Sequence, residues 1–141
     1  MEQTEHAQPR PRNSQELLTG LIEVSLDPAA FSHRDHVAAA FGALERFEFF
    51  TAMQVYADGL RALTVKAGVP EKFNATVTLA FISLIAEKMA EGYDDADAML
   101  AAHPELLRRD LLGAWYSKGR ISSDLARRVA VLPDRIVALN S

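Results

Sequence analysis

The sequence predicts an all-α protein, a single bundle of six or seven helices around a central apolar helix at about 71–91. Apolar residues recur at spacings of three and four along most of the chain, whereas no run alternates apolar and polar residues as a half-buried strand would. Residues that favour helix N-caps precede several of these apolar runs. We therefore expect one helical domain over 13–141, preceded by a flexible polar tail over 1–12.

The first half of the chain carries clear signals for where helices start and stop. Ser32 is a natural N-cap, and Asp35 three residues later forms a variant of the capping box, with Asp in place of Glu. The first helix is expected to be capped by Asn13 or Ser14 and to run to about Val24. After a turn at Asp27-Pro28, a second helix is expected at about 33–47, with Ser32 as its cap. A third, capped by Thr51, is expected to stop at Gly68 and Pro70.

The segment at about 71–91 is apolar on nearly every side until Glu87. Such a pattern is typical of a helix that its neighbours surround. Val77 and Thr78 are β-branched and would allow a strand, but the length between the stop signals favours a helix. We therefore place this helix at the centre of the bundle, ending at Gly92.

The second half is expected to hold three shorter helices. The first covers 95–102, with Asp94 or Asp95 as its cap, and the second begins at Pro104, which suits a first helical turn, and runs to about Tyr116. The third lies near 124–130 and is capped by Ser122 or Ser123. His103, directly before Pro104, is interpreted as a solvated loop residue.

Two of the four histidines lie one helical turn apart, at His33 and His36. Side chains three residues apart share a helix face. The same face continues with apolar residues: Val37, Ala40, Phe41, Leu44 and Phe47. Both imidazoles are therefore expected to face inward, where they would either transfer a proton, contact a substrate or serve as satisfied core residues.

Polar residues also interrupt the apolar helix, at Asn74, Thr76 and Thr78. Buried polar groups must find partners, and His33 and His36 are the candidates on the facing helix. A polar cluster inside an apolar bundle predicts a small-molecule site. The alternative is that the threonines bond to carbonyls of their own helix and that Asn74 caps it.

The histidine pair is a weak candidate for a metal site. Two histidines at a spacing of three can bind one divalent ion, but the sequence offers no third ligand nearby, no HExxH or ExxH motif and no cysteine. A helix N-terminus also disfavours a cation. We predict no cofactor, and a divalent metal at His33 and His36 is the less favoured option.

The run Phe31-Ser32-His33-x-x-His36, followed by Gly68-Val69-Pro70-x-Lys72-Phe73-Asn74-Ala75-Thr76-x-Thr78, resembles a family of small all-helical bacterial proteins without a settled activity. That family carries F-[ST]-H-x-x-H and then G-V-P-x-K-Y-H-E-T-x-T. The resemblance continues through Trp115-Tyr116-Ser117, Arg127 and Pro133-Asp134. It implies that the two motif helices face each other, and that typical members complete a polar or metal-like site with a histidine and a glutamate.

This chain departs from the family pattern at two positions, because Asn74 replaces the histidine and Ala75 the glutamate. Asparagine is a poor ligand for transition metals, and alanine removes the carboxylate. The resemblance also implies that Tyr116 and Arg127 lie at the rim of the pocket, where Arg127 can hold a carboxylate. The predicted substrate contacts are therefore Asn74, Thr78, Tyr116 and Arg127.

The composition of the chain limits the classes of partner that we expect. The net charge of −4 argues against nucleic acid and anionic membranes as partners. The chain has no cysteine and no apolar run long enough for a signal peptide or a membrane span, so we expect a cytoplasmic protein. We predict a small-molecule-binding domain, with or without enzymatic proton transfer by His33 or His36. The alternative is a non-catalytic interaction or dimerisation module, such as a homodimer, with structural histidines.

Overall fold

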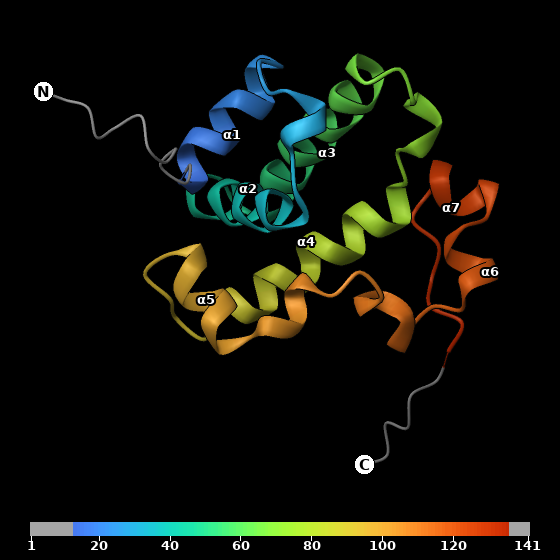
Figure 1. Ribbon diagram of the computed structural model, residues 1–141. Coiled ribbons are helices and arrows are strands. Elements are labelled where there is room, and N and C mark those ends of the chain that lie inside the picture. Colours follow the sequence, from blue (N-terminus) through green and yellow to red (C-terminus); the bar gives the residue numbers. More distant parts are fainter. Residues whose placement is uncertain (1–12, 136–141) are drawn as a thin grey trace, which may run out of the picture.

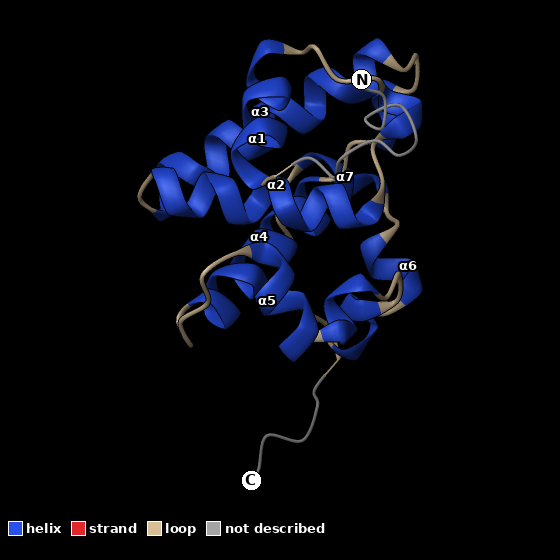
Figure 2. Ribbon diagram, turned by 60° about the vertical axis from the view of Figure 1, so that its left-hand side comes forward, coloured by secondary structure: helices blue, strands red, loops and turns tan. Residues whose placement is uncertain are grey.

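The computed structural model describes residues 13–135, so the predicted tail at 1–12 and the chain after 135 lie outside the described residues. The described range is all-α, as predicted, and holds seven α-helices joined by loops and 3₁₀ turns, without a strand (Figures 1 and 2). The helices are α1 (Ser14–Glu23), α2 (His33–Arg46), α3 (Phe49–Lys66), α4 (Ala75–Met89), α5 (Ala96–Ala102), α6 (Lys118–Ile121) and α7 (Asp124–Arg128).

The first two helix starts are confirmed, and the third is wrong by three residues, because the predicted cap is Thr51 and the observed cap is Glu48. Asn13 caps α1, and Ser32 caps α2 with Asp35 completing its capping box. Helix α3 begins at Phe49 because the Glu48 carboxylate accepts the backbone N–H groups of Phe50 and Thr51. A carboxylate that reaches two free N–H groups of the first turn makes a better cap than the Thr51 hydroxyl placed inside it.

Helices α1, α2 and α3 pack against one another and contribute many of the buried apolar residues of the core. Every residue of α2 from Val37 to Ala43 is buried. The small residues of this run allow close packing: a Cβ on Gly42 would lie 2.7 Å from the backbone oxygen of Ser14 in α1. These three helices provide the rigid frame for one wall of the site described below.

Helix α4 lies between this three-helix unit and the C-terminal part of the chain (Figure 1), in contact with α2, α3 and α7. It begins at Ala75 and not near 71, because Pro70 opens a separate 3₁₀ turn over Pro70–Lys72 and Asn74 is an extended N-cap. Helix α5 over Ala96–Ala102, capped by Asp95, agrees with the prediction.

The predicted helix from Pro104 to about Tyr116 is wrong. The chain forms two 3₁₀ turns there, Pro104–Leu107 and Leu111–Ala114. Arg108 between them is extended, with its guanidinium bound to the Asp110 carboxylate, so helical hydrogen bonding cannot continue through it. The sequence also gave no indication of the short helix α6, which Ser117 caps, while α7 is capped by Ser123 as predicted.

None of the helices within 13–135 has both the length and the apolar character that crossing a bilayer requires.

Candidate functional site

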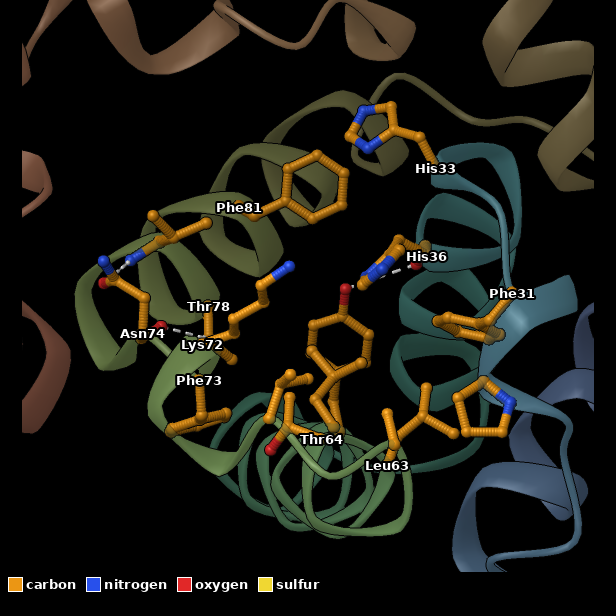
Figure 3. A pocket seen from close by; sticks show the side chains of 16 residues that line it. Phe31, His33, His36, Leu63, Thr64, Lys72, Phe73, Asn74, Thr78 and Phe81 are labelled. Carbon is orange, nitrogen blue, oxygen red and sulfur yellow. Dashed lines mark hydrogen bonds between the residues drawn. The ribbon is translucent and has the colours of Figure 1, made fainter.

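A pocket of about 310 Å³ opens between α2, α3 and the start of α4 (Figure 3). Its walls are mostly apolar, with aromatic rings from Phe31, Phe73 and Phe81 and aliphatic side chains from α3. The polar side chains in its lining are His33, His36, Tyr56, Thr64, Lys72, Asn74 and Thr78. The structure therefore brings both predicted histidines, Asn74 and Thr78 to one cavity, although these residues come from distant parts of the chain.

His36 lies in the apolar wall with its ring edge-on to Phe31, the ring centroids 4.6 Å apart. Within the described residues its imidazole makes no hydrogen bond; the Tyr56 hydroxyl that points towards this residue reaches the backbone oxygen instead, at 3.4 Å. Burial, and then the neighbouring His33, lower the pKa of His36 to about 4, and Asp35 opposes this only partly. At neutral pH the ring is uncharged, and its nitrogens remain available to a ligand.

His33 is tied into the fold by a hydrogen bond that His36 lacks. Its Nε2 donates to the backbone oxygen of Leu106 at 3.0 Å, and its ring lies 5.5 Å from that of Phe81. This contact holds the turn at Pro104–Leu107 against the N-terminus of α2. One ring nitrogen of His33 therefore has a structural partner.

Asn74 and Thr78 line the pocket but direct their polar atoms at backbone groups. The Asn74 Oδ1 accepts the N–H of Val77, and its Nδ2 donates to the backbone oxygen of Ile121 at 2.8 Å. Thr78 Oγ1 donates to the backbone oxygen of Asn74 at 2.8 Å. The expectation that the histidines satisfy these groups is wrong. The alternative of a helix cap and a bond to a carbonyl four residues earlier is correct for Asn74 and Thr78, but it is wrong for Thr76, whose hydroxyl bonds to carbonyls outside its own helix. Figure 3 shows Asn74 and His36 on opposite sides of the pocket.

Thr76 is fully buried and lies outside the pocket lining, on the side of α4 that faces the C-terminal segment. Its hydroxyl lies 2.9 Å from the backbone oxygen of Ala126 and 2.8 Å from that of Val129, and it accepts the N–H of Val131 at 3.0 Å. This hydroxyl therefore attaches α7 and the loop after it to α4.

The structure does not bring Tyr116 and Arg127 to this pocket. The Tyr116 hydroxyl donates to the backbone oxygen of Val131 at 3.0 Å, and the Arg127 guanidinium donates to the backbone oxygen of Ser122 and pairs with Asp124. Both side chains hold the C-terminal segment to itself, which is why neither reaches the cavity.

Lys72 is a pocket residue to which the sequence analysis gave no role. It ends the 3₁₀ turn Pro70–Lys72, and Figure 3 shows its ammonium group directed into the cavity, towards the space between Phe81 and His36. Its position in the sequence indicates that it lies near the pocket, because Lys72 stands two residues before the helix cap Asn74 in the second motif. Its side chain could not be placed without the turn that Pro70 starts.

His103 is not a solvated loop residue as interpreted. Its Nε2 lies 2.6 Å from Glu91 Oε1 and its Nδ1 lies 3.1 Å from Glu105 Oε2, with the Tyr93 hydroxyl 3.0 Å from Nε2. The hydrogen bond to Glu91 is the main cause that raises the pKa of His103; desolvation opposes it, and the hydrogen bond to Glu105 adds a smaller rise. This network joins the end of α4 to the end of α5.

Over residues 13–135, no three side chains of His, Cys, Asp or Glu are arranged to hold a metal ion. His33 and His36, with ring centroids 6.1 Å apart, have no carboxylate beside them in the pocket lining. The prediction that the pair does not hold a metal stays a prediction.

No family model, curated protein or solved structure matches this chain. The geometry of the pocket is therefore the basis on which a function is argued.

Proposed function

We propose that this protein binds a small, largely apolar molecule in the pocket between α2, α3 and α4, with His36 as its main hydrogen-bonding contact. The observation that carries the proposal is the His36 imidazole, which lies in an apolar wall without a hydrogen-bond partner among the described residues. A mostly buried polar group without a partner costs on the order of 1–3 kcal/mol, and a ligand that bonds to it recovers that cost.

The size and lining of the pocket support the proposal. Ligand pockets in proteins begin at roughly 300 Å³ and combine apolar walls with a few polar groups that fix orientation. This pocket, at about 310 Å³, suits a ligand of one or two fused rings or a short branched chain. Its aromatic walls favour a flat apolar body.

The state of His36 also bears on whether a reaction takes place. A neutral imidazole can donate to a ligand, accept from it or take a proton from it. If the protein is an enzyme, His36 is the group we propose for proton transfer, and His33, whose Nε2 is engaged by Leu106, is the group that orients the neighbouring turn. Asn74 and Thr78 then shape the wall, since their polar atoms are already bonded to backbone groups.

An interaction or dimerisation module with structural histidines is the alternative. It requires both histidines to be satisfied inside the fold. His33 meets that requirement through Leu106, but His36 does not within the described residues. The binding function accounts for both histidines, so we prefer it.

A titration with 2-naphthol, followed by two-dimensional NMR of the backbone amides, tests the proposal. We expect the largest shifts at pocket residues of α2, α3 and α4. His36→Phe keeps a ring in the wall but removes the hydrogen bond, and should weaken binding by about tenfold, the equivalent of one hydrogen bond. His103→Gln, which removes a histidine outside the pocket, is the matched control and should bind as the parent does. Shifts confined to other surfaces, or equal affinity in His36→Phe, would contradict the proposal.

A further inference from the structure

Among residues 13–135, the lining of the pocket contains one lysine, Lys72, and no arginine, aspartate or glutamate. The lysine is carried by a short 3₁₀ turn that Pro70 starts and that is bonded through the Lys72 N–H to the backbone oxygen of Val69. This turn therefore fixes the backbone of Lys72 at the edge of the pocket. Lys72 is exposed at the mouth of the pocket, and Figure 3 shows its side chain directed over the pocket, towards the space between Phe81 and His36.

The Lys72 ammonium also has no hydrogen bond or ion pair with any residue from 13 to 135. Lys66, six residues earlier, shows how the fold uses a lysine for structure: its ammonium donates to the backbone oxygens of Val24 and Leu26. Lys72 has no such task. His36 is uncharged at neutral pH, and no carboxylate of the described residues lines the pocket to compensate the charge of the Lys72 ammonium.

We infer that the ligand is a small apolar carboxylic acid whose carboxylate pairs with Lys72 while its apolar body lies among Phe31, Phe73 and Phe81. This inference rests on the proposed function, and it adds the chemical class of the ligand. An uncompensated cation beside apolar walls selects an anion, since an amine would be repelled and a neutral group would leave the charge unpaired.

The number of donors favours a carboxylate over a phosphate. A phosphate carries about two charges at neutral pH and is usually held by several donors, such as arginines or the N–H groups of a helix N-terminus. Here Asn74 already accepts the N–H of Val77 at the start of α4, and no arginine lines the pocket. One ammonium and one neutral imidazole match the single charge and two oxygens of a carboxylate.

Three probes of similar shape test the inference: 2-naphthoate, its neutral counterpart 2-naphthamide, and the cation 2-naphthylmethylammonium. Dissociation constants are measured by isothermal titration at pH 7.5 and low salt, with the binding surface assigned by NMR. We expect 2-naphthoate to bind about tenfold more tightly than 2-naphthamide, the cation to bind most weakly, and added salt to reduce the preference for the carboxylate.

The matched variants are Lys72→Met and Lys88→Met. Each variant removes one lysine charge, Lys72 from the turn before α4 and Lys88 from α4 itself, but Lys88 does not line the pocket. Lys72→Met should abolish the preference for 2-naphthoate over 2-naphthamide and leave the affinity for 2-naphthamide within about twofold, whereas Lys88→Met should keep the preference. Lys72→Arg should restore most of it.

The outcomes separate this inference from the proposed function. Binding of 2-naphthamide in the pocket without any preference for 2-naphthoate, or a preference that survives Lys72→Met, would overturn the inference and leave the binding function standing. If none of the probes shifts the pocket residues, both fail.

Discussion

Helix α4 has two neighbours that are attached to it in different ways. On one side, α1–α3 are joined by a continuous set of buried apolar side chains that includes Leu17, Phe41 and Ile82. On the other side, the segment at 115–135 has a small apolar cluster around Tyr116, and the side chains of Asn74 and Thr76 attach it to α4 by hydrogen bonds to its backbone. The pocket lies on the packed side, between α2, α3 and the start of α4.

The difference shows why the two sides respond differently to change. Apolar packing is spread over many contacts, so one truncation opens a cavity within a cooperative unit and lowers the stability of the whole. Where a segment is attached by the hydrogen bonds of a single side chain, removal of that side chain should release the segment without unfolding the helices on the opposite side of α4.

The largest effect is expected for Phe41→Ala on the packed side. Phe41 is 1% exposed, and removing its ring should lower the free energy of unfolding by about 3–5 kcal/mol. Phe50→Ala, at a ring that is 71% exposed, is the control and should cost less than about 1 kcal/mol. Urea unfolding measures both, and equal losses would mean that burial in α2 does not dominate stability.

Sequence reasoning succeeded where structure follows from periodic packing and strong caps. The N-terminal caps Asn13 and Ser32, the all-α class and the inward direction of the histidine pair all follow from spacing along one helix. These features need no knowledge of distant residues, because the apolar stripe and the capping group lie within a few positions of each other.

Reasoning failed where a group has several possible partners in space. Thr76 and Asn74 need partners, as expected, but the Thr76 hydroxyl and the Asn74 Nδ2 find theirs in the backbone at Ala126 and Ile121, which no spacing rule connects to α4. The same limit applies to Lys72, whose direction depends on a 3₁₀ turn, and to Tyr116 and Arg127, which hold the C-terminal segment together. Hydrogen bonds to a distant backbone leave no periodic pattern in a sequence.

Acid should weaken the packed side through His36. The pKa of His36 lies near 4 in the folded chain against an ordinary value of 6.5, so the unfolded chain binds more protons between these two values. Stability from this residue is therefore present above pH 6.5 and is lost as the pH falls towards 4, by about 3 kcal/mol at most.

Unfolding measured at pH 7.5, 5.5 and 4.0 tests this expectation in the parent and in His36→Phe. Because carboxylates also titrate in this range, the informative quantity is the difference between the two proteins at each pH. We expect the variant to gain stability relative to the parent as the pH falls. A constant difference would show that the His36 ring accepts a proton in the folded protein without cost.

The smallest of these effects, and the most local, is expected for Thr76→Val. Valine keeps the shape of the side chain but leaves the Val131 N–H and the carbonyls of Ala126 and Val129 without their shared hydroxyl, at a cost of about 1–3 kcal/mol. Thr78→Val is the matched control on the same helix, since its hydroxyl bonds to the carbonyl of the N-cap Asn74, four residues earlier, and it should be close to neutral.

Hydrogen exchange reports where stability is lost. In Thr76→Val the amides of Arg127, Val129 and Val131 should exchange faster, while those of α1–α3 keep their protection. Uniformly faster exchange would mean instead that the C-terminal segment and the packed helices unfold as one cooperative unit. The two sides of α4 would then differ in the kind of interaction that attaches them, but not in their response to its loss.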